Sequence, residues 1–455
     1  MFDDTIAAIA TPLGEGGLAV IRISGRHALA VADQAFTPVG PYASKPSAAV
    51  SHTIHYGKVM RAGQQVDEVL CAVMRAPRTF TREDVVEITC HGGVLSTKTV
   101  FDRVLECGAR AALPGEFTQR AFLNGRIDLA QAEAVADLIH ARTELALSAA
   151  NEQLAGKLSQ RINQLRDELM LTLAHIEAHI DFPEEDIAPD TRTQLENRMA
   201  RGIEFMDELL RTANEGQILR RGIRAAIIGR PNAGKSSLLN QLLGHDRAIV
   251  SHIAGTTRDT IEETANVRGI PVVFIDTAGL REAKDEIESE GIRRSRESLG
   301  KAELILHVLD ASEPLHAEDE KLLGEFADKK RIVVRNKMDL PRKLKSKTGA
   351  EAAVDVCSKS GEGIEALKDA IKSRVWSGNL TGEMAQVTIN SRHQDALKRA
   401  SASLRLALDA LRGDASLEFV ALDLRQGIAA VGEIVGKTTT EDLLDAVFSQ
   451  FCIGK

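Results

Sequence analysis

The hydrophobic pattern of the first 118 residues changes every few positions, as in a domain that mixes strands and helices. Residues 18–23 form a mostly apolar run of strand length, and residues 84–89 alternate between polar and apolar positions like a half-buried strand. Glycines at positions 14, 16, 17, 92 and 93 punctuate these runs and predict turns. We therefore expect an α+β domain over residues 1–118.

From residue 119 the apolar positions recur at helical spacing. Steps of three or four residues place them in one stripe, which predicts a single long helix that ends near Pro183. The positions are Leu154, Leu158, Ile162, Leu165, Leu169, Leu173, Ile176 and Ile180. Helical patterns fill residues 119–217 and return in residues 379–455, so we expect these two segments to pack together in one bundle.

Between the helical segments, residues 218–378 alternate between strand and helix patterns, which is typical of an α/β domain. The apolar run Arg224–Ile228 leads into Gly229–Ser236, whose sequence is G-x-x-x-x-G-K-S, and a helical pattern follows. This is the context that a phosphate-binding loop requires. Backbone N–H groups would surround the phosphates, Lys235 would neutralise the β- and γ-phosphates, and Ser236 would hold Mg²⁺.

Two further motifs follow in the order expected of a nucleotide switch. Residues 272–275 predict a buried strand that ends in Asp276-Thr277-Ala278-Gly279, where a carboxylate can hold Mg²⁺ through water. Between this motif and the phosphate-binding loop lies Gly255-Thr256-Thr257-Arg258-Asp259. A solvated turn would explain that segment equally well in isolation, but its position favours Thr257 as the last ligand of Mg²⁺.

The fourth motif predicts which base is bound. Residues 331–335 predict a strand that leads into Asn336-Lys337-Met338-Asp339. The Asp339 carboxylate can accept hydrogen bonds from the ring N–H and the exocyclic amine of guanine, whereas adenine offers no such pair. The motifs together predict a GTPase. The expected GTP-binding residues are Asn232, Ala233, Gly234, Lys235, Ser236, Ser237, Ser251, His252, Ile253, Ala254, Gly255, Thr256, Thr257, Asp276, Thr277, Ala278, Gly279, Asn336, Lys337, Asp339, Cys357, Ser358 and Lys359.

The catalytic machinery departs from that of Ras-like GTPases, which carry a water-orienting Gln after Asp-x-x-Gly. This chain has Leu280 at that position. A leucine cannot hydrogen-bond water, so either hydrolysis is slow or another group orients the water. Residues 281–288 supply several carboxylates, although a solvated surface is the more common role of such a stretch.

Composition narrows the class of protein further. The length of 455 residues suggests about three domains, and no apolar run approaches the roughly 20 residues of a membrane span. Five cysteines at 71, 90, 107, 357 and 452 form no C-x-x-C pair, which indicates free thiols in a reducing cytoplasm. The acidic N-terminus lacks the basic start of a signal peptide. The net charge of −8 argues against a surface that binds nucleic acid over its whole area, but leaves a local basic patch possible.

Several short strings outside the nucleotide motifs are specific to one family. They are Pro114-Gly115-Glu116-Phe117-Thr118, Arg120-Ala121-Phe122-Leu123-Asn124-Gly125, Asp128-Leu129-Ala130-Gln131-Ala132-Glu133-Ala134, Asp181-Phe182-Pro183-Glu184-Glu185, residues 255–259 and the final Phe451-Cys452-Ile453-Gly454-Lys455. With the domain order, these strings make the chain resemble the MnmE (TrmE) family of tRNA modification GTPases over essentially its whole length.

The resemblance implies a function in tRNA modification. Members of the family homodimerise through the N-terminal domain. With the FAD-dependent partner MnmG (GidA), in a heterotetramer, they add a carboxymethylaminomethyl or aminomethyl group to C5 of the wobble uridine. The carbon comes from a tetrahydrofolate derivative, the 5-formyl or 5,10-methylene form, bound by the N-terminal domain. By similarity Arg22, Glu87 and Arg126 would contact the folate and Lys455 would reach the same site, although the family commonly has Lys where this chain has Arg126.

The resemblance also implies an answer to the leucine at position 280. In this family two GTPase domains meet, and K⁺ occupies the place of an arginine finger. The matching K⁺ ligands are the Asn232 side chain and the backbone of Ser251, Ile253 and Thr256, and the acidic residue that orients the attacking water matches Glu288. Cys452, near the end of the matching tail, would lie near the one-carbon unit as a catalytic thiol that either attacks a substrate covalently or positions it.

A regulatory GTPase of ribosome assembly is the alternative from a different class. Such proteins typically append an RNA-binding module, and none is visible in the sequence. They also have no use for a folate pocket or for a terminal Cys-Ile-Gly-Lys.

Overall fold

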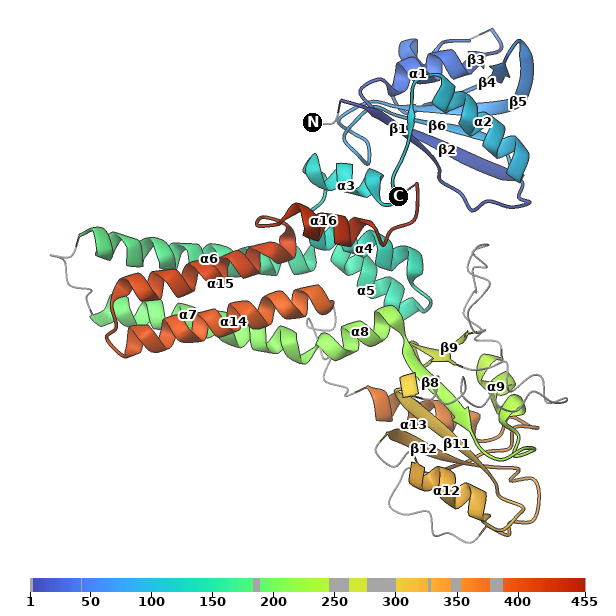
Figure 1. Cartoon of the computed structure of the whole chain (residues 1–455), viewed down its shortest axis with the longest axis vertical. Helices are drawn as coiled ribbons and strands as arrows, with labels where there is room; N and C mark the ends of the chain where they lie inside the picture. Colours follow the sequence, from blue (N-terminus) through green and yellow to red (C-terminus); the bar gives the residue numbers. More distant parts are fainter. Residues whose placement is uncertain are drawn as a thin grey trace. The chain divides into compact units, whose positions relative to one another are not determined.

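The structure of the chain is a computed structural model that describes residues 3–41, 43–182, 189–244, 262–275, 300–325, 329–344, 353–376 and 388–454. Two compact units form it (Figure 1). The first unit comprises residues 1–136, 159–167 and 428–455, and the second comprises residues 137–158 and 168–427.

A seven-stranded sheet dominates the first unit, with the strand order β3-β4-β5-β6-β2-β1-β7. The strands are β1 (Thr5–Ile9), β2 (Leu18–Gly25), β3 (Phe36–Pro38), β4 (Thr53–Arg61), β5 (Gln64–Met74), β6 (Val85–His91) and β7 (Arg110–Ala111). Neighbouring strands are antiparallel except for β1 and β7, which run parallel. Strands β2 and β6 confirm the strands expected at residues 18–23 and 84–89.

The two faces of this sheet differ. Helices α1 (Ala28–Ala35) and α2 (Val94–Glu106) cover one face over an aliphatic core that includes Ile21, Ile23 and Ile88. On the opposite face Ile54, Tyr56 and Leu70 are 69%, 47% and 46% exposed. Ile54 and Tyr56 are two residues apart on β4, and Tyr56 stands opposite Leu70 of β5. These three residues therefore share one face, which we call the open face of the sheet.

The C-terminal end of the chain returns to the first unit. Helix α16 (Glu441–Phe448) lies beside α3 (Glu116–Leu123), and the ring of Phe448 is 6.3 Å from that of Phe122 and 5.6 Å from that of Phe451. The Thr440 side chain caps α16 by accepting a hydrogen bond from the Leu443 amide. This helix belongs to the helical pattern expected over residues 379–455, and its end is held rather than frayed.

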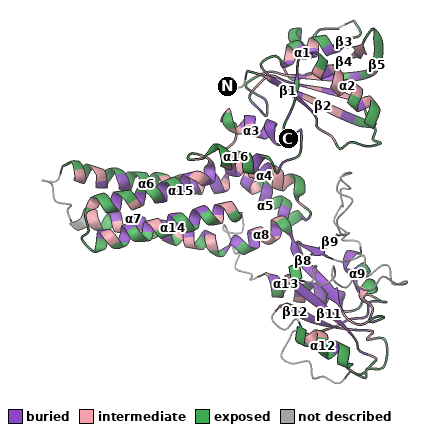
Figure 2. Ribbon diagram, viewed as in Figure 1, coloured by how far each residue is buried: buried purple, intermediate pink, exposed green. Residues whose placement is uncertain are grey.

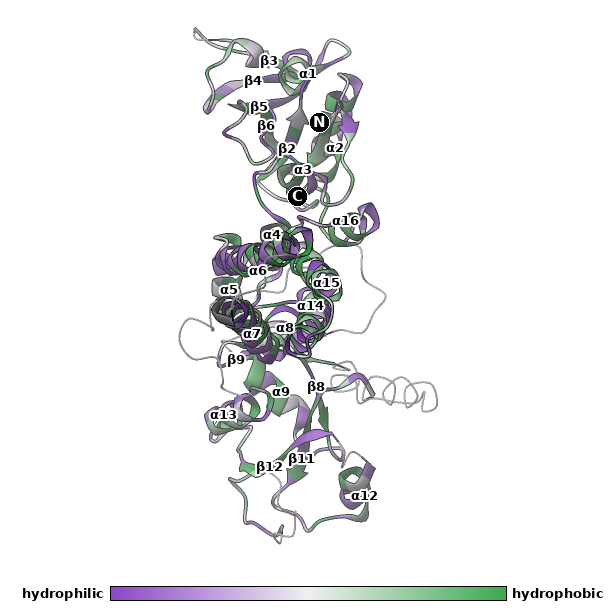
Figure 3. Cartoon of the chain, turned by 90° about the vertical axis from the view of Figure 1, so that its left-hand side faces the viewer, coloured by the Kyte–Doolittle hydropathy of each residue, from purple (hydrophilic) through white to green (hydrophobic). Residues whose placement is uncertain are grey.

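The helical region contains seven long or medium helices among the described residues. They are α4 (Leu129–His140), α5 (Glu144–Leu154), α6 (Lys157–Asp181), α7 (Pro189–Arg211), α8 (Ala213–Arg221), α14 (Ser391–Arg412) and α15 (Leu417–Val435). Figure 3 shows α6, α7, α14 and α15 nearly end-on. Ion pairs of Arg405 with Asp207 and of Arg412 with Glu196 join α14 to α7. The two helical segments of the sequence therefore form one bundle, as expected.

The prediction of one helix from Leu154 onward is wrong at its start. Helix α5 ends at Leu154, and Gly156 adopts a left-handed φ of +87° before α6 begins at Lys157. The step of four residues from Leu154 to Leu158 crosses this break without a change of spacing, so periodicity alone did not reveal it. The rest of the stripe is confirmed, because the apolar positions from Leu158 to Ile176 are at most 7% exposed in α6.

The inserted α/β domain has a six-stranded sheet with the order β13-β12-β11-β8-β10-β9. Its elements are β8 (Ile223–Ile228), α9 (Lys235–Leu243), β9 (Glu263–Val267), β10 (Ile270–Phe274), β11 (Leu304–Asp310), α12 (Ala317–Glu325), β12 (Lys330–Asn336), β13 (Ala353–Asp355) and α13 (Ile364–Val375). Only β9 runs antiparallel to its neighbour in the described sheet. The central strands are buried on both faces (Figure 2), and a mainly parallel sheet requires this.

The chain enters this domain from α8 and leaves it just before α14, and the two connections lie side by side. A Cβ on Gly216 of α8 would lie 2.7 Å from the carbonyl oxygen of Ile389, so only glycine allows this approach. Arg220 of α8 also forms an ion pair of 2.6 Å with Asp137 of α4. The insertion of an α/β domain into a helical one is therefore confirmed.

Within the described ranges, no helix has the length and apolar character needed to cross a membrane. The same residues bring together no group of three or more His, Cys, Asp or Glu side chains suited to a metal ion. All five cysteines are free, and only Cys452 is exposed.

Candidate functional site

The phosphate-binding loop connects the buried strand β8 to helix α9. Two of its glycines are required by close approaches with left-handed backbone. Gly229 has φ +145°, and a Cβ there would lie 2.3 Å from the carbonyl oxygen of Val308. Gly234 has φ +96°, and a Cβ there would lie 2.1 Å from the Asn336 amide nitrogen. The loop can therefore pass this close to its neighbours only with glycine at both positions.

Lys235 begins α9 and turns back over the loop. Its ammonium donates hydrogen bonds of 2.8 Å to the carbonyl oxygens of Gly229 and Arg230. Burial lowers the pKa of Lys235 below its ordinary value, because the charge has lost part of its hydration. A bound anion would restore favourable interactions to this cation. The helix N-terminus beside it adds a partial positive charge, and the whole arrangement suits phosphate oxygens.

Asn336 joins the motifs into one site. Its side-chain amide donates to the Ala233 carbonyl at 2.9 Å, and its carbonyl oxygen accepts from the Ser358 amide at 3.0 Å. The residue is 1% exposed, so both bonds form away from water. The structure thereby brings together the phosphate-binding loop, the N-K-x-D segment and the Cys357–Lys359 segment at the carboxyl ends of parallel strands, where α/β sheets bind ligands.

Asp339 of the N-K-x-D segment and Cys357 contact each other. The Cys357 thiol donates to the Asp339 carboxylate at 3.3 Å, and Asp339 itself is exposed. Cys357 is buried, and its thiol contacts the carboxylate that we expect to select guanine.

Asp310 was missed by the sequence interpretation. It ends β11, and its carboxylate forms an ion pair of 2.6 Å with Lys337. Burial alone would raise the pKa of Asp310, but hydrogen bonds from Lys337 and Ser312 hold it below its ordinary value. Lys337 has a left-handed φ of +64°, so the ion pair helps to fix the motif in a strained conformation. The sequence offered one signal for Asp310: it is an acidic residue at the end of an apolar run between the Asp-x-x-Gly and N-K-x-D motifs.

The remaining expected residues of this site divide into two groups. Asn232, Ser236 and Ser237 are exposed around the start of α9, and Lys359 is exposed beside the buried Ser358. The others lie outside the described residues. They are Ser251, His252, Ile253, Ala254, Gly255, Thr256, Thr257, Asp276, Thr277, Ala278, Gly279 and Glu288.

A second group of expected residues meets on the open face of the N-terminal sheet. Arg22 of β2 and Glu87 of β6 are cross-strand partners, and their side chains form an ion pair of 2.8 Å. The Arg22 guanidinium also lies 5.8 Å from the centre of the Phe117 ring and donates to the Gly454 carbonyl at 3.1 Å. The sheet, helix α3 and the C-terminal tail therefore converge on one side chain.

Helix α3, which carries Phe117, is fixed by a buried cation. Arg120 has no exposed surface and forms ion pairs with Asp4 at 2.7 Å, Glu116 at 3.0 Å and Glu83 at 3.2 Å. Burial would raise the pKa of Glu116, but its hydrogen bonds from Arg110, Arg120 and the Leu113 amide hold it below the ordinary value. Arg120, the first residue of the string at residues 120–125, therefore holds helix α3 in place.

Two other expected residues are less closely joined to Arg22. Arg126 is exposed in the loop between α3 and α4, and its side chain makes no hydrogen bond or ion pair with another described residue. Cys452 is exposed, and its carbonyl accepts from the Gly115 amide at 3.4 Å. Lys455 lies outside the described residues.

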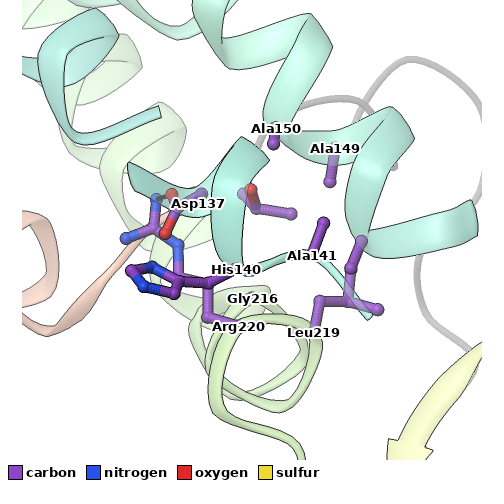
Figure 4. A pocket seen from close by; sticks show the side chains of 10 residues that line it. Asp137, His140, Ala141, Ala149, Ala150, Gly216, Leu219 and Arg220 are labelled. Carbon is purple, nitrogen blue, oxygen red and sulfur yellow. Dashed lines mark ion pairs between the residues drawn. The ribbon is translucent and has the colours of Figure 1, made fainter. Parts of the chain in front are cut away.

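Figure 4 shows a small cavity between α4, α5 and α8, beside the Asp137–Arg220 ion pair. Its volume of about 20 Å³ is enough for a single water molecule. Alanines 141, 146, 149 and 150 line much of it. This cavity is therefore a packing feature of the helical region and offers no space for a cofactor.

The fold and the nucleotide site define the class of protein: a P-loop protein of the GTPase type, with its α/β domain inserted in a helical domain. Family models match almost the whole chain, with "GTP-binding protein TrmE N-terminus" over residues 5–126 and "MnmE helical domain" over residues 129–452.

Full-length relatives agree with the family models. The tRNA modification GTPase MnmE of Bacillus velezensis is 47% identical over 461 residues, which covers 99% of this chain and 100% of the relative. The protein of the same name from Geobacter metallireducens is 46% identical over 458 residues, with 100% and 99% covered. This chain belongs to the MnmE family of tRNA modification GTPases.

A solved structure of the G domain of the T. maritima FeoB iron transporter is 28% identical, and the match covers 33% of this chain and 98% of that chain. The TM-score of this match is 0.26, so the family assignment rests on the sequence relatives.

Proposed function

We propose that this chain binds and hydrolyses GTP and acts in the modification of C5 of the wobble uridine in tRNA. The observation that supports this most is the Asn336 bridge between the phosphate-binding loop and the base-recognition segments. Motifs that no longer bound a nucleotide would not need a buried, hydrogen-bonded bridge between their loops. The names of the relatives, tRNA modification GTPases, supply the pathway.

In the GTP site, each described residue has a role that follows from its chemistry. Lys235 and the loop amides balance phosphate charge, and Asp339 accepts hydrogen bonds from guanine. Mg²⁺, when bound, neutralises charge on the phosphates, and Ser236 and Thr257 would hold it. The exposed position of Ser236 at the start of α9 fits this role.

K⁺ would stabilise the negative charge that develops during hydrolysis, in place of an arginine finger. Asn232 fits a ligand role because it is exposed on the phosphate-binding loop with φ +62° and carries an amide oxygen. The backbone of Ser251, Ile253 and Thr256 would complete the shell. Glu288 would orient the attacking water, a task that Leu280 cannot perform.

In the N-terminal domain we propose a site for a tetrahydrofolate derivative, which would supply the transferred carbon. A pterin ring offers both N–H donors and a carbonyl acceptor, and the Arg22–Glu87 pair offers the complementary groups on an open sheet face. Arg126 and Lys455 would complete the contacts, and the Cys452 thiol would act beside the transferred carbon.

The proposed assembly is a homodimer through the N-terminal domain, joined by a flavoprotein of the MnmG type in a heterotetramer. The open face supports a dimer contact there, because Ile54, Tyr56 and Leu70 place apolar side chains next to one another in solvent. Because the proposed chemistry involves tRNA in the reducing cell interior, we place the protein in the cytoplasm, where its exposed Cys452 would stay a thiol.

The test of the nucleotide part is phosphate release from GTP and from ATP by the purified chain with Mg²⁺ and K⁺. We expect release from GTP only, because Asp339 cannot form its pair of hydrogen bonds with adenine. Equal release from both nucleotides would contradict the assignment of the base site.

A further inference from the structure

The C-terminal segment, residues 451–454, lies against the N-terminal domain in an ordered conformation. Phe451 is 7% exposed, and its ring packs against that of Phe448. The Cys452 carbonyl accepts a hydrogen bond from the Gly115 amide. Gly454 has φ +94°, and a Cβ there would lie 2.8 Å from the carbonyl oxygen of Ile9 in β1. The segment therefore passes so close to the sheet that it needs glycine at this position.

Arg22 of the sheet donates to this segment near its end. The Nη1 atom of Arg22 bonds the Gly454 carbonyl at 3.1 Å while its Nε atom bonds Glu87 at 2.8 Å. The Phe117 ring lies beside the same guanidinium. Glu87 and Phe117 fix the orientation of a group that would otherwise sample many rotamers, so the Nη1 donor is held toward the segment.

We propose that Arg22 is a positioning residue that anchors the C-terminal segment on the N-terminal domain and so fixes the location of Cys452. Cys452 lies between two contacts that hold the segment: the packing of Phe451 against Phe448 and the hydrogen bond from Arg22 to the Gly454 carbonyl. With the Arg22 contact broken, the Gly115 bond of 3.4 Å, which is long, is the one hydrogen bond that residues 452–454 keep to the rest of the described chain. The consequence for tRNA modification rests on the proposed role of Cys452, whereas the anchoring does not.

The experiment measures release of the segment directly. The full-length chain is digested with a carboxypeptidase of broad specificity, and mass spectrometry follows the loss of residues up to Cys452. Digestion under mild conditions follows the population of the open form. A hydrogen bond to a charged group contributes a factor of about ten or more to such a population, so Arg22→Met should be digested about tenfold faster.

Matched variants separate anchoring from general damage. Arg26→Met makes the same change of charge just after the same strand, at a side chain that is 73% exposed and 3.6 Å from Asp3, and it should be digested at the parent rate. Arg22→Lys keeps a cation but lacks the planar guanidinium that donates to Glu87 and Gly454 at the same time. Its digestion rate should therefore lie between those of the parent and Arg22→Met. Thermal melting of each variant controls for global unfolding.

Digestion of Arg22→Met at the rate of Arg26→Met, with equal melting temperatures, would overturn the proposal. If Arg22→Met melts early, Glu87→Gln replaces it, because this variant retains Arg22 but weakens the bond that orients it. A rate for Glu87→Gln equal to that of the parent would then overturn the proposal. No GTP, folate or tRNA is present in these digests, so a failure of anchoring is distinct from a failure of the proposed function.

Discussion

The substitution Gly234→Ala tests the geometry of the nucleotide site with a single methyl group. The added Cβ would lie 2.1 Å from the Nδ2 atom of Asn336. Ordinary contact needs about 3.5 Å, so Asn336 would have to move by more than ~1 Å. It cannot do so and keep its two bonds, to the Ala233 carbonyl at 2.9 Å and from the Ser358 amide at 3.0 Å.

The magnitude follows from three costs. Each buried hydrogen bond left unmade costs about 1–3 kcal/mol. Alanine at φ +96° adds about 1–3 kcal/mol of backbone strain. Even the lower limits sum to about 3 kcal/mol, and because they fall on the conformation that binds GTP, the affinity should fall at least roughly 100-fold.

The assay is a fluorescence titration with a labelled GTP analogue, with thermal melting of each variant. The matched control is Gly324→Ala in α12 of the same domain, where a Cβ meets no atom within 4 Å and φ is not left-handed. This control should bind like the parent and melt slightly higher, because alanine favours a helix. Binding of GTP by Gly234→Ala within twofold of the control would refute this geometry of the nucleotide site.

Three further predictions concern the base, the cation and the thiol. Asp339→Asn should hydrolyse XTP instead of GTP, since xanthine has a carbonyl at the edge where guanine has its amine; an unchanged preference in a paired hydrolysis assay would remove Asp339 from its assigned role. GTP turnover should be much faster in KCl than in matched NaCl, by a factor approaching the roughly 10³–10⁵ of an arginine finger, and Asn232→Ala should erase the difference while nucleotide binding persists. Equal rates in the two salts would contradict the K⁺ site. Cys452→Ser should fail to restore the modified wobble uridine in a knockout strain, measured by nucleoside mass analysis with GTP hydrolysis as the folding control; full restoration would make Cys452 a bystander.

The strands around the nucleotide site could be predicted because each is a short apolar run next to a motif of fixed spacing. Residues 224–228 and 331–335 both lie in parallel strands whose apolar positions are buried. The parallel order puts their carboxyl ends at one edge, so proximity of the motifs also followed. The bridge made by Asn336 did not follow, because its partners are backbone groups of two loops distant in the sequence.

The limits elsewhere have similar physical causes. The break at Gly156 left the spacing of leucines unchanged, and only the glycine signalled it. The Asp310–Lys337 pair depends on which strands are neighbours. Strand β11, which carries none of the nucleotide motifs, lies between β8 and β12 in the sheet. The resemblance implied that Arg22 and Glu87 contact one ligand, but their ion pair did not follow from it, because the two residues are far apart in the chain and meet through the register of β2 and β6.

The central claim, that this chain is a GTPase of wobble-uridine modification, is tested most directly in a bacterial strain that lacks its own family member. The tRNA of that strain, with and without this chain expressed, is digested to nucleosides and measured by mass spectrometry, and ribosomal subunits are profiled in parallel. We predict that the C5-modified wobble uridine is absent in the knockout and restored by the chain, but not by its Gly234→Ala variant. An unmodified wobble uridine that persists with the chain expressed, or normal tRNA with an imbalance of ribosomal subunits in the knockout, would contradict the account.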